Sequence, residues 1–436
     1  MNPFPQEALQ PGVQKREVFG WAMYDFANSG YTTVVLTAVF SAYFVGVVAG
    51  GAPWATFAWT LALAVSNLLV MLTMPALGAY ADLRAAKKRL LALSTLGCVL
   101  ATAALGWAGP GDLAWAVVAV VLSNVFFTYG ESLIAAFLPE LAKPESLGRV
   151  SGWGWSFGYF GGMLTLGLSL AYVLAAQQRG ESAAQFVPVT MWITAATFAL
   201  AAVATFALLR ERAQPQEGRR EAEHRLLASL QRLRHTWQEA GRFRDFTRLL
   251  FCAVAYQGGI AVVIALAAIY AEQALGFKQI ETMLLIFLVN IASAIGAFAW
   301  GYVQDRIGHR AALAVTLAGW VLMTAIAGLA QGRGAFWVAA VIAGLCMGSS
   351  QSAGRALAGL FAPEARRAEF FGLWIFAVRL SAILGPVTYG LVTLASGGNH
   401  RLAILSTGAF FMVGLVLLFG IDVARGAAAA REGDAP

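Results

Sequence analysis

Four ionisable residues, Asp25, Glu131, Arg355 and Arg379, interrupt apolar runs that are long enough to cross a bilayer. Each costs at least about 2.5 kcal/mol at a bilayer centre, so such residues are default candidates for function. Their charges sum to zero. They are therefore candidates for binding a charged solute or a proton, and the alternative is that they form buried ion pairs that only set helix packing.

Polar neighbours accompany the first of these charges. Asp25, Asn28, Ser29, Thr32 and Thr33 stand at i, i+3, i+4, i+7 and i+8, which places them on one helical face. This stripe predicts a surface that faces water or a polar solute. For Asp25 alone, a carboxylate near a helix start that is favoured by the helix dipole stays an alternative.

Similar polar faces occur in other runs. Asn124, Thr128 and Glu131 share a face in the fourth run, and Gln351 and Arg355 share one in the tenth. The complete set of candidate cavity residues is Asp25, Asn28, Ser29, Thr32, Asn124, Thr128, Glu131, Tyr256, Gln257, Gln351, Arg355 and Arg379.

The elements that must position these residues are predicted to be transmembrane helices. The chain has 436 residues, of which 59% are hydrophobic and 12% charged, which excludes one soluble globule. A span needs about 20 apolar residues. Twelve such runs lie at 18–48, 54–81, 90–108, 113–137, 152–176, 188–209, 248–271, 281–303, 311–330, 335–360, 370–395 and 402–421. The predicted fold is an all-α polytopic membrane protein with twelve transmembrane helices.

Two repeated loops divide the chain into similar halves. GAYADLRAAKKR begins at Gly78, and GYVQDRIGHR begins at Gly301. Glu131 and Arg355 are also separated by nearly the same offset, so we hypothesise that they face each other and pair in one state. The predicted domains are 1–209, a linker at 210–247, and 248–436.

Each repeated loop is predicted to act as a conformational latch. Its glycine allows close helix approach, and its aspartate lies where arginines or helix ends hold it. The latch residues are Gly78, Asp82, Arg84, Gly301, Asp305, Arg306 and Arg310.

Basic residues predict the orientation of the spans. Of the Lys and Arg residues that lie outside the predicted spans or at their ends, 24 fall on one side of the membrane and 4 on the other. Positive charge marks the cytoplasmic side. Both termini are therefore expected in the cytoplasm, and the net charge of +7 needs no nucleic acid. The linker is expected to be either an amphipathic helix on anionic lipid, through Leu226, Leu227, Leu230, Leu233 and Trp237, or a solvated surface segment.

Metal and cofactor chemistry is not expected. The cysteines Cys98, Cys252 and Cys346 lie in separate runs, and all four histidines lie between runs. No nucleophile with a nearby base is recognisable, so we do not expect an enzyme.

The repeated loops match the signature G-x-x-x-D-[RK]-x-G-[RK] of the major facilitator superfamily, although Leu83 follows Asp82 in the first copy. Within it, YDFANSG from Tyr24, LPELA from Leu138 and GRVSGWGWSFGYFGG from Gly148 resemble the group of the fungal vacuolar amino-acid effluxer linked to autophagy. This resemblance implies that runs one, four, seven and ten line a cavity. The chain departs from its relatives at YQGG, which begins at Tyr256, where relatives often carry an acidic residue.

The fifth run is rich in glycine, with Gly152, Gly154, Gly158, Gly161 and Gly162. Relatives with antiport activity often have a glycine-rich fifth span that contains a Gly-Pro pair, but no proline follows here. Close packing against another helix is the preferred interpretation.

Taken with the resemblance, these features favour a secondary carrier that moves a small, amino-acid-like solute outward by alternating access with proton coupling. An exporter of amphipathic drugs or lipids is an alternative, with aromatic residues such as Trp21, Tyr24, Tyr31 and Tyr256 as contacts. A receptor or assembly partner without transport is a further alternative. The expected partners are the solute, protons and lipid, and the expected state is a monomer in a bacterial cytoplasmic membrane.

Overall fold

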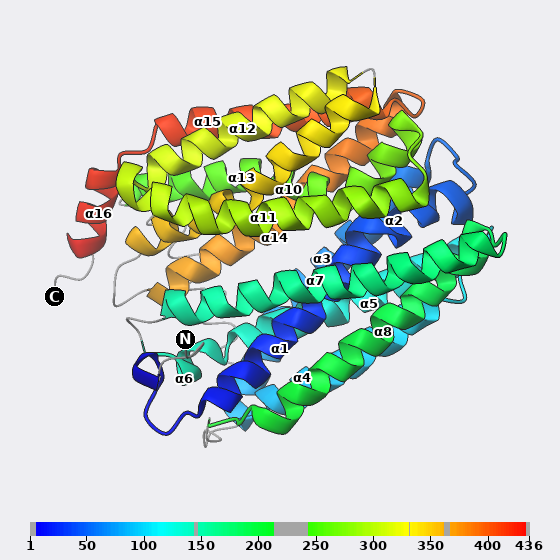
Figure 1. Ribbon diagram of the computed structural model, residues 1–436. Helices are drawn as coiled ribbons and strands as arrows, with labels where there is room; N and C mark the ends of the chain where they lie inside the picture. Colours follow the sequence, from blue (N-terminus) through cyan, green and yellow to red (C-terminus); the bar gives the residue numbers. More distant parts are fainter. Residues whose placement is uncertain (1–5, 144–146, 213–242, 331, 362–366, 433–436) are drawn as a thin grey trace. The chain divides into compact units, whose positions relative to one another are not determined.

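A computed structural model describes residues 6–143, 147–212, 243–330, 332–361 and 367–432 (Figure 1). The first part of the chain forms η1 (Gln6–Ala8), α1 (Lys15–Tyr31), η2 (Thr32–Ala38), α2 (Phe40–Tyr43), η3 (Phe44–Val48), α3 (Ala55–Arg84), α4 (Lys87–Leu105), α5 (Leu113–Ala135), α6 (Leu138–Leu141), α7 (Leu147–Gln178) and α8 (Ala183–Leu208). The second part forms α10 (Arg244–Leu275), α11 (Gln279–Ile307), α12 (His309–Leu329), α13 (Arg333–Leu360), α14 (Arg367–Ala395), α15 (His400–Phe419) and α16 (Val423–Glu432).

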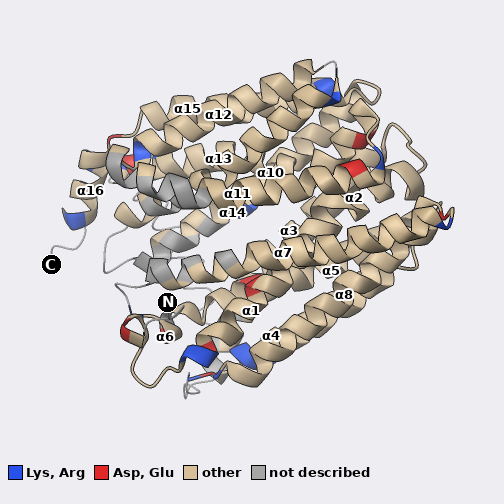
Figure 2. Cartoon of the chain, viewed as in Figure 1, with Lys and Arg blue, Asp and Glu red and all other residues tan. Residues whose placement is uncertain are grey.

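Within these described residues, twelve helical segments are long and apolar enough to cross a membrane, which confirms the predicted spans. Among the described residues, most charged positions lie near helix ends, and few lie in the helix middles (Figure 2). Several helices begin before the apolar runs; α7 starts at Leu147 and α10 at Arg244. Hydropathy detects the part that matches the hydrocarbon, whereas backbone hydrogen bonding continues into the interface.

The first span departs from the regular helix that its periodicity predicts. The backbone widens to a π-helix at Thr32–Ala38 and again at Phe44–Val48. The N–H of Val39 donates to the carbonyl of Val34, five residues back, at 3.0 Å. Wide turns of this kind shift the faces of later residues, so the 3.6-residue stripe is continuous only as far as the start of this segment.

The chain forms two compact units, one mainly of residues 1–224 and one mainly of residues 225–436; residues 56–64 belong to the second unit and 278–283 to the first. In the first unit α1 packs along α7 and α8, and α4 packs along α5 and α8. In the second unit α10 packs along α14 and α15, and α12 along α13 and α15. The same pairing in both units confirms the predicted similar halves.

The latch loops are described only in part. The side chains of Gly78, Asp82, Arg84, Gly301, Asp305 and Arg306 lie outside the described residues, as do the linker leucines and Trp237. After the first loop, Lys88 Nζ donates to the carbonyl of Leu209 at 2.5 Å. After the second, Arg310 Nη2 donates to the carbonyl of Phe419 at 3.0 Å. In both units a basic residue that opens the third helix therefore binds the end of the sixth.

Candidate functional site

The polar stripe of α1 lies mainly against α7. A Cβ built on Gly154 would meet the Asp25 carboxylate and, at 2.8 Å, the ring of Trp21. One on Gly158 would meet Ser29 Oγ at 2.7 Å, and one on Gly162 would meet Thr33 Oγ1 at 2.8 Å. Three stripe residues thus fit directly onto the glycines of α7.

Gly161 gives the closest backbone approach in this contact. A Cβ there would lie 2.6 Å from the carbonyl carbon of Phe26 and 2.7 Å from its Cα. Real Cβ contacts this short do not occur between packed helices, so only glycine permits the observed spacing. The prediction that the α7 glycines serve helix packing is confirmed for Gly154, Gly158, Gly161 and Gly162.

Asn28 occupies the neighbouring face of α1 and is 6% exposed. Within the described part of the chain, neither its Nδ2 nor its Oδ1 has a hydrogen-bond partner. Its carbonyl accepts a hydrogen bond from Thr32 Oγ1 at 3.3 Å. A buried amide without a partner costs about 1–3 kcal/mol, so Asn28 is the polar side chain of α1 best suited to bind a polar ligand.

The candidate residues of α5 extend from the buried core to a half-buried carboxylate. Asn124 Nδ2 donates to Ser66 Oγ of α3 at 2.5 Å. Thr128 is 2% exposed, and Glu131 is half-buried one turn farther along. An acidic side chain therefore ends a polar face in an otherwise apolar helix, as the sequence predicts.

In the second unit the structure brings two candidate amides together. Gln257 of α10 donates from Nε2 to Gln351 Oε1 of α13 at 2.8 Å. The neighbouring Tyr256 is fully buried, and its hydroxyl lies where a side chain on Gly354 would be. The hydrogen bond joins the seventh and tenth spans, which the resemblance places at the cavity.

Of the two candidate arginines, only one has a side chain within the described part of the structure. Arg379 of α14 is half-buried, whereas the side chain of Arg355 lies outside the described residues. The pairing of Glu131 with Arg355 therefore stays a prediction.

Sequence reasoning missed the partners of the aromatic side chains. Tyr24 bonds Thr95 at 2.9 Å, and Tyr31 bonds Ser123 at 2.8 Å, each through its hydroxyl. Trp21 Nε1 donates to the carbonyl of Ile134 at 2.9 Å. All three aromatic residues are at most 3% exposed. They hold α1 to its neighbours, and no local sequence signal identifies the hydroxyls that they meet.

An ionic cluster at the start of α4 was also missed. Glu211, which follows α8, accepts hydrogen bonds from the N–H groups of Lys87 at 2.8 Å and Lys88 at 3.1 Å. Lys87 Nζ forms an ion pair with Glu140 of α6. A carboxylate at the first N–H groups of a helix satisfies unpaired donors and complements the helix dipole.

Comparison with known proteins identifies the family. The profile described as "Vacuole effluxer Atg22 like" matches residues 45–431. The chain is 24% identical over 409 residues to YxiO, an uncharacterized MFS-type transporter of Bacillus subtilis, covering 91% of this chain and 93% of that protein. It is 27% identical to autophagy-related protein 22-1 of Aspergillus niger over 44% of this chain and 35% of that protein.

Solved structures show the fold. A point mutant of the nucleoside transporter NupG superposes with a TM-score of 0.69 at 13% identity, covering 93% of this chain and 98% of that one. A D-xylose–proton symporter gives a TM-score of 0.66 at 13% identity, covering 91% and 96%. With twelve spanning helices in two repeated units, the chain is a multi-pass membrane transporter of the major facilitator type, and it belongs to the Atg22-like vacuole effluxer family.

Proposed function

We propose that this transporter exports a small, polar, amino-acid-like solute by alternating access, coupled to protons. The observation that carries the proposal is the buried amide of Asn28 on α1, three residues after Asp25, which has no hydrogen-bond partner among the described residues. An amide that offers both a donor and an acceptor complements the carboxylate and ammonium groups of an amino acid. The family description as an effluxer supports the outward direction.

The buried aromatic residues weigh against the amphipathic alternative. Trp21, Tyr24, Tyr31 and Tyr256 are at most 3% exposed. An apolar ligand against Asn28 would leave the amide unsatisfied, at a cost of about 1–3 kcal/mol. A polar solute is therefore the better match.

The orientation and setting are part of the same proposal. The excess of Lys and Arg on one side supports cytoplasmic termini. The half-buried carboxylate of Glu131 is the preferred proton carrier. We propose a monomer in a bacterial cytoplasmic membrane.

Counterflow tests the proposed substrate class. Proteoliposomes that contain the full chain and an unlabelled amino-acid mixture are given the same mixture in labelled form. We expect labelled amino acids to accumulate transiently above the level of protein-free liposomes. Absence of counterflow with well-folded protein would remove amino acids as substrates, and labelled lipids and amphipathic cations would then be tested in the same vesicles.

The amide pair of the second unit gives a specific prediction. Gln257→Leu and Gln351→Leu each remove the hydrogen bond between α10 and α13 and leave the other amide without this partner. We expect each to lower exchange about tenfold, the equivalent of about 1.4 kcal/mol. Gln273→Leu, at an exposed position of α10, is the matched control. Normal exchange by both amide variants would exclude this pair from the transport site.

A further inference from the structure

Each unit buries an acidic residue in the first turn of the long helix that begins its repeat. Glu17 lies in the first turn of α1, and Asp245 lies in the first turn of α10. Both residues are 2% exposed. Buried carboxylates require a partner, because an unpaired charge away from water is strongly unfavourable.

In the first unit the partner follows the last helix. Arg212, beyond the end of α8 at Leu208, donates from Nη2 to Glu17 Oε1 at 2.8 Å and to the carbonyl of Gly12 at 3.3 Å. The N–H of Gln14 donates to the same carboxylate oxygen at 3.0 Å. Glu17 Oε2 has no partner among the described residues. The start of α1 is thus tied to the chain that leaves α8.

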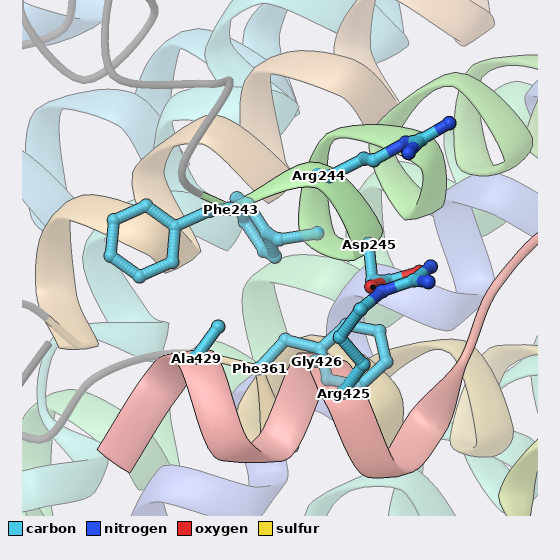
Figure 3. A pocket seen from close by; sticks show the side chains of 8 residues that line it. Phe243, Arg244, Asp245, Phe361, Arg425, Gly426 and Ala429 are labelled. Carbon is cyan, nitrogen blue, oxygen red and sulfur yellow. Dashed lines mark hydrogen bonds and ion pairs between the residues drawn. The ribbon is translucent and has the colours of Figure 1, made fainter. Parts of the chain in front are cut away.

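The second unit repeats the arrangement with a stronger geometry. Arg425, beyond the end of α15 at Phe419, donates from Nε to Asp245 Oδ2 at 2.6 Å and from Nη2 to Oδ1 at 2.7 Å. The N–H of Asp422 adds a bond to Oδ1 at 2.9 Å. Figure 3 shows the guanidinium of Arg425 against the Asp245 carboxylate. A two-bond fork of this kind fixes orientation as well as distance.

The surroundings of Asp245 hold the arginine in place. A cavity of about 220 Å³ beside the pair is lined by residues of α10 and α16, by Phe243, which precedes α10, and by Phe361, which follows α13 (Figure 3). A Cβ on Gly426 would lie 2.6 Å from the Phe361 ring, so Gly426 lets α16 pack closely there. Asp422 Oδ1 accepts from the N–H of Arg425 at 3.0 Å, which anchors the first turn of α16.

We propose that these two ion pairs are equivalent clasps, and that Glu17 and Asp245 position the helices that carry the binding residues. Asn28 follows Glu17 by 11 residues, and Gln257 follows Asp245 by 12. At 1.5 Å per residue these spacings are about 16–18 Å along the helix. Since α1 packs along α8 and α10 along α15, each clasp fixes the first helix of a unit against rotation and sliding on the last. This inference rests on the proposed function for the role of Asn28 and Gln257.

Two measurements on the full chain test the clasp without any substrate. In a thermal double-mutant cycle, Arg425→Gln should lower the unfolding temperature most, because it leaves the buried Asp245 carboxylate unpaired. The double variant with Asp245→Asn should lower it by clearly less than the sum of the two single variants, because both changes remove the same pair. Hydrogen exchange at residues 255–259 of α10 should rise about tenfold in each variant. Additive temperature shifts would overturn the pairing. Unchanged exchange at 255–259 would overturn the positioning role.

Transport kinetics give the functional readout. Asp245→Asn and Glu17→Gln should each raise the apparent KM about fivefold with Vmax per folded protein within about twofold, as expected when binding groups are displaced. Arg425→Lys keeps the charge but loses the fork, and should lie between native and Arg425→Gln. Arg431→Gln, which changes an exposed residue of α16, is the control.

An unchanged KM with a lowered unfolding temperature would reduce the clasps to structural supports. If the native protein shows no amino-acid counterflow, amino acids are excluded as its substrates. Amide hydrogen exchange then still tests the positioning role of the clasps.

Discussion

Glu131→Gln is expected to lower proton-driven accumulation of the solute about tenfold or more. Counterflow, measured at similar internal and external pH, should stay largely intact. The half-buried carboxylate lies on α5 one turn beyond the buried Thr128. A carboxylate exchanges a proton, whereas the amide of glutamine has the same shape and stays neutral at every pH. The substitution therefore removes the proposed proton carrier while it preserves the shape of the side chain.

The measurement compares uptake with and without an imposed pH gradient in the same proteoliposomes. Glu181→Gln, which replaces a glutamate beside Arg179 outside the spanning helices, is the matched control and should behave as native protein. Two results would contradict the assignment. Gradient-driven accumulation in Glu131→Gln would exclude this carboxylate as the proton carrier, and loss of counterflow as well would assign it to the transport cycle itself.

Periodicity and composition were sufficient to predict the spans, because a helix in lipid must satisfy its backbone internally and must be apolar over the hydrocarbon thickness. The repeated loops predicted two similar units, and the matching helix pairs in both units confirm this. The glycines of α7 predicted a close contact, and Phe26 of α1 fills it. Each of these inferences depends on a pattern that is visible within one segment of sequence.

The ionic contacts could not be predicted in the same way. Glu17 and Arg212 are 195 residues apart, and Asp245 and Arg425 are 180 apart. Both acids look like ordinary helix-start carboxylates, which the helix dipole favours without any cation. The widening of the helix at Thr32 is equally hidden, because local π turns depend on how a span fits its neighbours.

The stripe of α1 shows a related limit. An apolar helix with polar residues on one face predicts a polar environment on that side, but helical periodicity does not distinguish a solute from a neighbouring helix. Ser29 and Thr33 lie against α7 glycines, whereas Asn28, on the next face, has no partner in the described residues. These two environments differ because of α7, whose contacting glycines, Gly158 and Gly162, lie 129 residues beyond Ser29 and Thr33.

Gly161→Val is expected to cause a large loss of folded transporter. The added Cβ would lie 2.6 Å from the carbonyl carbon of Phe26, against an optimal separation of about 3.5–4.0 Å. Backbone atoms of α1 cannot rotate away, so the two helices must separate along their whole contact. We expect a destabilisation of about 3 kcal/mol and at least about a tenfold loss of exchange, measured by thermal unfolding and by counterflow.

The neighbouring glycines turn this expectation into a graded test. At Gly158 the nearest atom is Ser29 Oγ at 2.7 Å, which is the end of a side chain that can rotate, so Gly158→Ala should cost less than Gly161→Ala. At Gly334, near the start of α13, nothing lies within 4 Å of the added Cβ, and Gly334→Val should be tolerated. If Gly161→Val unfolded and transported like Gly334→Val, the separation of α1 and α7 would not be set by this contact. The expected order follows from what the added side chain meets: backbone atoms that cannot move at Gly161, a hydroxyl that can rotate at Gly158 and no atom at Gly334.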